Sequence, residues 1–254
     1  MRGFIGVMGL VVALTACGSG GTAGAAPAST GPAVPGTSVP SESASASTPP
    51  PTGPNVSGCY HTKDGKIFTY GGGMPGIIGG TGSVGVVITY ERRGTVCSWR
   101  PLFDRLAPHY RVLVYTRSSQ ALPEDTAVAM ARRLLKERGV ERVFMLGGSI
   151  GATTAVPAAL RLGPEVAGVV AVSGQISQEN AGKLTVPLLQ IGSEHDGYGG
   201  AGDLTRAHDA ATKAPDNELL VIPGESLHAS ALLAGPHAKQ VLDKIDAFMA
   251  RHKG

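Results

Sequence analysis

The chain alternates between short, continuous apolar runs and longer segments in which apolar residues recur at helical spacing. Continuous runs are typical of strands buried on both faces of a sheet, and helical spacing is typical of the helices that cover it. The runs that predict strands lie at residues 66–70, 84–90, 111–115, 142–146, 167–172, 187–191 and 218–222, with a weaker one at 77–78. The segments that predict helices begin near residue 101 and span residues 123–138, 150–162, 203–213 and about 235–252. This alternation predicts an α/β protein with a mostly parallel, twisted sheet, helices on both faces and an antiparallel edge.

Residues that favour helix ends support some of these boundaries. Ser98 is expected to cap the helix that begins near Pro101, and Asp203 is expected to cap the helix that it opens. Gly139 is expected to end the helix of residues 123–138, because glycine readily takes the left-handed conformation found there.

The N-terminal segment has the features of an export signal. Arg2 precedes an apolar stretch at residues 4–14, which is too short to span a bilayer as a helix. The stretch ends in LTAC, which resembles a bacterial lipobox, so residues 1–17 are predicted to be a lipoprotein signal peptide with Cys17 lipidated. The alternative is an ordinary secretory signal with a chance cysteine. Lipidation implies an extracytoplasmic protein that is held on the cell membrane by acyl chains.

Composition divides the rest of the chain into two parts. Residues 18–57 are rich in Gly, Ser and Pro and nearly free of charge, which predicts a disordered linker. Residues 58–254 are long enough to form one domain with a sizeable core. The formal net charge of +3 comes from interspersed charges, and the chain has a single Trp, so we expect no nucleic-acid partner.

The sequence VFMLGGSIGA, which contains Ser149, is the strongest indication of chemistry. A predicted strand runs directly into Gly-x-Ser-x-Gly and a predicted helix follows, which is the context of a nucleophile elbow. Gly147 and Gly151 leave room for strand and helix to approach each other. Because glycine-rich turns are common in a chain with 37 glycines, a plain strand-to-helix loop is the alternative.

A serine nucleophile needs a base and an acid that orients the base, and both types of residue follow later strands. Glu194 and Asp196 follow the strand at residues 187–191, and His228 follows the strand at residues 218–222. From about Gly58 onward the chain resembles the α/β-hydrolase superfamily, with PLLQIGSEHD similar to its acid-bearing loop and VIPGESLH similar to its histidine loop. The resemblance implies an α/β-hydrolase fold with the triad Ser149, Asp196 and His228, and Glu194 remains the alternative acid.

Two features depart from the usual pattern of the superfamily. The strand VGVVITY runs into Tyr90-Glu91 where a His-Gly pair is usual, so the oxyanion hole is expected to combine the backbone N–H groups of Ile150 and Arg92. Only about a dozen residues lie between Gly174 and Pro187, which leaves no room for a substantial cap domain.

Two further pairs of residues have open interpretations. Arg92 and Arg93 fall beside the expected site, either as a solvated loop or as ligands for an acidic group on the substrate. Cys59 and Cys97 are the pair that remains outside the signal segment, and outside the cytoplasm they predict a disulfide, with two separate buried thiols as the alternative. The cysteines and histidines show no close metal-ligand spacing, and no metal or organic cofactor is implied.

These features favour an extracytoplasmic, membrane-anchored serine hydrolase that cleaves an ester-type bond in a small-molecule substrate. One alternative is another acyl hydrolysis on the same fold, by a peptidase, a thioesterase or a dienelactone-type hydrolase. Another is a non-catalytic binding lipoprotein, which the missing His-Gly pair would favour. The sequence carries no indication of an oligomeric state.

Overall fold

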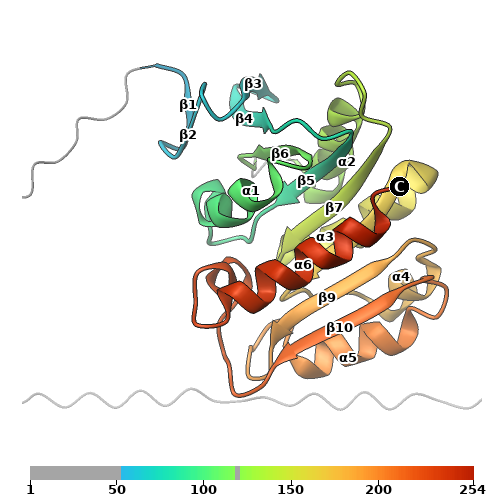
Figure 1. Cartoon of the computed structure of the whole chain (residues 1–254). Helices are drawn as coiled ribbons and strands as arrows, with labels where there is room; N and C mark the ends of the chain where they lie inside the picture. The colour runs from blue at the N-terminus through green and yellow to red at the C-terminus, as the bar shows by residue number, and fades with distance from the viewer. Residues whose placement is uncertain (1–52, 118–120) are drawn as a thin grey trace, which may run out of the picture. The chain divides into compact units, whose positions relative to one another are not determined.

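An eight-stranded sheet forms the centre of the computed structural model, which describes residues 53–117 and 121–254 (Figure 1). The predicted signal peptide, Cys17 and most of the predicted linker lie outside the described residues. The strand order is β10-β9-β8-β7-β5-β6-β4-β3. The strands are β3 (Lys66–Tyr70), β4 (Met74–Gly79), β5 (Val84–Thr89), β6 (Arg111–Tyr115), β7 (Arg142–Gly148), β8 (Val166–Val172), β9 (Leu188–Ser193) and β10 (Asn217–Ile222).

The sheet is parallel except at one edge. β4 pairs antiparallel with both β3 and β6, whereas β5, β6, β7, β8, β9 and β10 pair in parallel. β5 and β8 are buried along their whole length, which explains their continuous apolar sequences. The predicted parallel sheet with an antiparallel edge is therefore confirmed.

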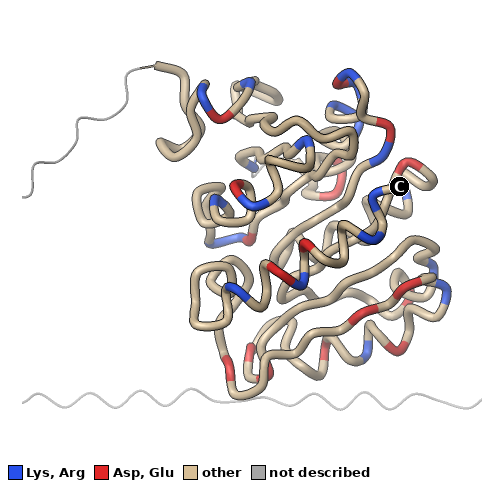
Figure 2. The backbone as a smooth tube through the Cα atoms, in the orientation of Figure 1, with Lys and Arg blue, Asp and Glu red and all other residues tan. Residues whose placement is uncertain are grey.

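Helices cover both faces of this sheet. Side chains of α1 (Arg100–Leu106) and α6 (Ala238–His252) pack into one apolar cluster, and those of α2 (Pro123–Leu134), α3 (Ile150–Leu162), α4 (Gln178–Lys183) and α5 (Ala201–Ala210) pack into the other. Lys, Arg, Asp and Glu are spread over the helices and connecting loops, and the central strands carry few of them (Figure 2). Within the described part of the chain, no helix combines the length and apolar character that crossing a membrane requires.

The connection between β8 and β9 contains only α4, as the short spacing predicts. This helix packs against α3 and α5, on one side of the sheet. The described residues therefore include no large cap.

Three predicted helix ends differ from the structure. Ser98 lies inside a 3-10 helix, η1 (Val96–Trp99), and α1 begins after Trp99 without a side-chain cap. The N-cap of α5 is Gly200, and the Asp203 carboxylate reaches back from inside the helix to accept the Gly199 N–H at 3.0 Å. α2 ends at Leu134, and the chain makes further turns before Gly139 takes its left-handed conformation (φ 81°).

The folded part also begins before the end of the predicted linker. β1 (Asn55–Val56) pairs with β2 (Tyr60–His61), and the Val56 and Tyr60 side chains are fully buried. The predicted disulfide between Cys59 and Cys97 is present and joins this hairpin to η1. Apolar burial and the cross-link together order a segment whose composition predicts disorder.

Candidate active site

Ser149 occupies a strained turn between β7 and α3. Its backbone takes φ 55° and ψ −120°, a region that non-glycine residues rarely adopt. The Ser149 N–H donates to the Val172 carbonyl of β8 at 2.9 Å, which holds the turn in place. This is the geometry of a nucleophile elbow, because it lifts a serine hydroxyl out of the sheet edge at a helix N-terminus.

Close packing around the turn requires glycine on both sides of Ser149. A Cβ atom on Gly151 would lie 1.9 Å from the Thr89 carbonyl oxygen, and one on Gly147 would lie 2.3 Å from the Gly151 carbonyl carbon. A Cβ atom on Gly148 would lie 2.4 Å from the Trp99 ring. The glycines in the motif are thus fixed by sterics, as the sequence pattern suggests.

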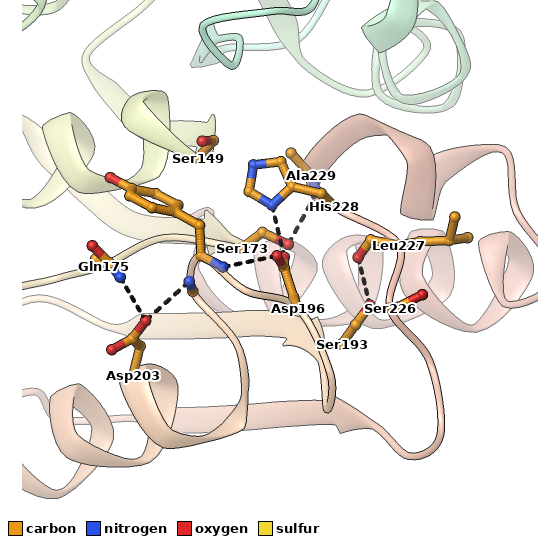
Figure 3. A network of polar contacts seen from close by, with 12 residues as sticks. Ser149, Ser173, Gln175, Ser193, Asp196, Asp203, Ser226, Leu227, His228 and Ala229 are labelled. Atoms are coloured by element: carbon orange, nitrogen blue, oxygen red, sulfur yellow. Dashed lines mark hydrogen bonds and ion pairs between the residues drawn. The ribbon is translucent and has the colours of Figure 1, made fainter. Parts of the chain in front are cut away.

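His228 is paired with Asp196. The imidazole Nδ1 lies 2.7 Å from Asp196 Oδ2, and Asp196 Oδ1 accepts the Tyr198 backbone N–H at 3.0 Å (Figure 3). The Asp196 side chain is 6% exposed, whereas that of Glu194 is 46% exposed and accepts the Gly224 N–H instead. Of the two candidate acids, Asp196 is therefore the one that contacts the histidine. With Nδ1–H donating to the carboxylate, Nε2 is left as a proton acceptor.

Two buried serines that the sequence interpretation missed hold the backbone beside His228. Ser193 Oγ donates to the Leu227 carbonyl at 2.5 Å, and Ser173 Oγ accepts the Ala229 N–H at 3.0 Å (Figure 3). Both serines are fully buried, one at the end of β9 and the other just after β8. A small polar residue at the end of a buried strand is the signal that could have found them, because a buried hydroxyl needs a partner.

Side chains hold the loop after β5, which carries Tyr90-Glu91 at the position of the usual His-Gly pair. Glu91 is buried, and its Oε2 accepts the Trp99 indole N–H at 2.7 Å while its Oε1 accepts a hydrogen bond from Ser230. Arg117 donates to the Glu91 carbonyl at 2.8 Å, and its guanidinium lies 4.6 Å from the centroid of the Tyr90 ring.

The two backbone N–H groups expected to form the oxyanion hole belong to residues that line the cavity beside Ser149. Ile150 is the first residue of α3, so its N–H has no partner within the helix. Among the residues that the structure describes, neither the Ile150 nor the Arg92 N–H donates to a backbone carbonyl.

Ser149 and His228 line one cavity of about 470 Å³. Tyr198, which sequence reasoning also missed, lines this cavity, with its ring centroid 5.9 Å from that of His228. Asp196 is outside the lining because it lies behind His228. The described residues contain no cluster of His, Cys, Asp or Glu suited to hold a metal ion. The lining residues are Glu91, Arg92, Arg93, Ser149, Ile150, Tyr198 and His228.

No protein-family model and no curated protein sequence matches the chain. Solved structures resemble it at low identity. An esterase of Pyrococcus furiosus is 14% identical with a TM-score of 0.61, over 74% of this chain and 90% of the esterase. A monoacylglycerol lipase of Paleococcus ferrophilus is 13% identical with a TM-score of 0.61, over 70% of this chain and 99% of the lipase. A structure of the metagenome-derived lipolytic enzymes LipS and LipT is 17% identical with a TM-score of 0.58, over 70% of this chain and 97% of that one.

The chain has the α/β-hydrolase fold. In this fold a nucleophile, an acid and a histidine follow one another along the chain, at the carboxyl ends of parallel strands. Here Ser149 follows β7, Asp196 follows β9 and His228 follows β10.

Proposed function

We propose that this α/β-hydrolase-fold protein is a serine hydrolase that cleaves an ester-type acyl bond. The observation that carries the proposal is the 2.7 Å contact between Asp196 and a histidine that lines the same cavity as Ser149. A strained serine, a histidine and a buried acid have no shared structural reason to meet at three loop ends.

The chemistry follows from the position of each group. Ser149 Oγ attacks the substrate carbonyl while His228 Nε2 takes its proton, and His228 then gives this proton to the leaving alcohol. The backbone N–H groups of Ile150 and Arg92 stabilise the oxyanion of the tetrahedral intermediate. Asp196 keeps the imidazole in the required tautomer and stabilises its charged form. Water, activated by His228, then hydrolyses the acyl-enzyme and restores Ser149.

Arg92 and Arg93 are proposed to bind an acidic group on the substrate. Both side chains are exposed at the cavity that contains Ser149. With a matched pair of esters that differ only in one carboxylate, Arg92→Gln and Arg93→Gln should raise KM for the anionic ester several-fold and leave the neutral ester unchanged. Equal effects on both esters would exclude this role and favour a solvated basic loop.

The protein is further proposed to act outside the cytoplasm as a lipoprotein anchored through Cys17. The disulfide between Cys59 and Cys97 supports an oxidising compartment. Expression of the full chain and of Cys17→Ala in a bacterial host tests the anchor. The variant should leave the membrane fraction and should no longer incorporate labelled palmitate. A variant that stays in the membrane fraction and still incorporates palmitate would contradict the proposed anchor.

A fluorophosphonate probe tests the catalytic proposal directly. The full chain should be labelled at Ser149, as located by peptide mass, and Ser149→Ala should not react. A folded wild-type protein that stays unlabelled would contradict the hydrolase and favour a binding lipoprotein on the same fold. A panel of ester, amide and thioester substrates then separates an esterase from a peptidase or a thioesterase.

A further inference from the structure

Glu91 is a buried carboxylate in the loop that is expected to supply an oxyanion donor. It directly precedes Arg92, and its side chain turns away from solvent into the protein. A carboxylate in such a place needs hydrogen-bond donors, because removing a charge from water is otherwise strongly unfavourable. Gly94 leaves room for it, since a Cβ atom there would lie 2.2 Å from Glu91 Oε1.

The donors to this carboxylate come from two other segments that border the site. Trp99 in η1 donates its indole N–H at 2.7 Å, and Ser230, two positions after His228, donates its hydroxyl. The Trp99 ring also lies against the elbow, where it would contact a Cβ atom on Gly148 at 2.4 Å. Glu91 therefore links the loop before Arg92, the elbow and the loop that carries His228.

We propose that Glu91 is a positioning residue, which holds the Arg92 N–H and His228 at the correct positions around the substrate carbonyl group. Because this role presupposes the proposed hydrolysis, it deepens that function and does not replace it. Displacement of a reacting group by about 1 Å can cost about a hundredfold in rate, and loss of one oxyanion donor costs as much or more. A carboxylate that bonds both loops can thus control the rate through the groups that it holds in place.

Substitutions at Glu91 and Ser230 separate positioning from charge. With the full chain and p-nitrophenyl acetate, Glu91→Ala should lower kcat by about a hundredfold and Ser230→Ala by about tenfold, with little change in KM. Glu91→Gln should keep kcat within a few-fold, because the amide oxygen can accept from Trp99 while the amide NH₂ donates to Ser230. The double variant should be no slower than Glu91→Ala, since Ser230 acts through Glu91.

Tyr60→Phe is the matched control for a general loss of stability. It removes a buried hydrogen bond to the Val96 carbonyl in the neighbouring η1 segment and does not touch Glu91. This variant keeps the tyrosine's ring and the cross-link between Cys59 and Cys97, so it should lower Tm and leave kcat unchanged. If Glu91→Ala and Ser230→Ala retain wild-type kcat, or lose no more of it than Tyr60→Phe at equal Tm, the positioning role is overturned and the hydrolase stands. Wild-type protein that neither hydrolyses the ester nor reacts with a fluorophosphonate overturns the hydrolase and the positioning role together.

Discussion

The two sides of the candidate site are held in place by different means. The elbow depends on backbone bonding and on the absence of side chains, through the Ser149 N–H bond to Val172 and the glycines at positions 147 and 151. The loop after β5 depends on side chains, namely the Glu91 carboxylate with its two donors and the Arg117 guanidinium on the Glu91 carbonyl. The first arrangement leaves a short sequence motif, whereas the second joins residues that lie far apart in the chain.

The comparison implies different sensitivities. The elbow, whose geometry is fixed by sterics, should lose stability when a single methyl group is added. A side held by side chains should respond to changes in the segments that carry those side chains, including loss of the cross-link between η1 and the N-terminal hairpin.

The largest expected effect concerns Asp196, the acid that contacts the histidine. Asp196→Asn should lower kcat by about 10⁴-fold, because the amide favours the wrong imidazole tautomer. Glu194→Gln is the control and should change kcat little, since that carboxylate binds the Gly224 N–H and not His228. Steady-state kinetics on both variants would contradict the assignment if the two effects were exchanged.

Addition of a methyl group at Gly151 tests the steric side. Gly151→Ala should lower the free energy of unfolding by about 3 kcal/mol, because the Cβ atom overlaps the Thr89 carbonyl oxygen and the packed elbow cannot relax fully. Gly202→Ala in α5 is the control, since its Cβ atom would meet only the end of the Arg206 side chain at 3.4 Å. That variant should gain about 0.5–1 kcal/mol. Urea unfolding measures the free energy of unfolding of both variants. Equal values would contradict the steric explanation of the elbow.

Loss of the disulfide tests whether the side-chain-held loop depends on its neighbours. Replacement of Cys59 and Cys97 by serine opens a cross-link between residues 38 apart, which should lower the free energy of unfolding by about 4 kcal/mol. Because η1 carries Trp99, kcat of the protein that remains folded should also fall by a few-fold. A loss of stability with unchanged kcat would show that Glu91 is held independently of the hairpin.

The smallest expected effect is a pH dependence of stability that arises from the ion pair between Asp64 and Arg100. The hydrogen bond from the Arg100 guanidinium holds the pKa of Asp64 below its usual range. A carboxyl group whose pKa is lowered by folding stabilises the protein above its unfolded pKa, and this contribution is lost as pH falls through the lowered value. Asp64→Asn should therefore be about 2 kcal/mol less stable than wild type at neutral pH. The difference should close progressively below about pH 4. A difference in Tm that stays constant down to strongly acidic pH would contradict this pairing.

Much of the fold could be predicted because its central strands are buried on both faces. Continuous apolar sequence then identifies strands such as β5 and β8 without any tertiary knowledge. The hairpin of β1 and β2 could not be predicted, because Val56 lies in a polar, glycine-containing neighbourhood and is buried only by packing on distant residues. α4, with 6 residues, is too short for a helical period to be recognised.

The residues of the candidate site that lie in recognisable sequence motifs could be predicted. Ser149 lies in a strand–turn–helix motif, and Asp196 and His228 each follow an apolar strand. Tyr90-Glu91 is visible in the sequence as a departure from the usual His-Gly pair, but the role of Glu91 could not be predicted, because its partner Ser230 is 139 positions away. A buried polar network is specified by tertiary packing, so it becomes visible only once the elements are assembled.

The placement of α4 beside α3 and α5 also bears on how fast the protein could turn over. Enzymes with a mobile cover often spend most of each cycle in opening and closing it. α4 packs on its neighbouring helices and does not line the cavity of Ser149, so it need not move for a substrate of the proposed hydrolase to enter. If the proposed function holds, we expect bond making and breaking, including hydrolysis of the acyl-enzyme, to limit kcat, which should then be insensitive to solvent viscosity.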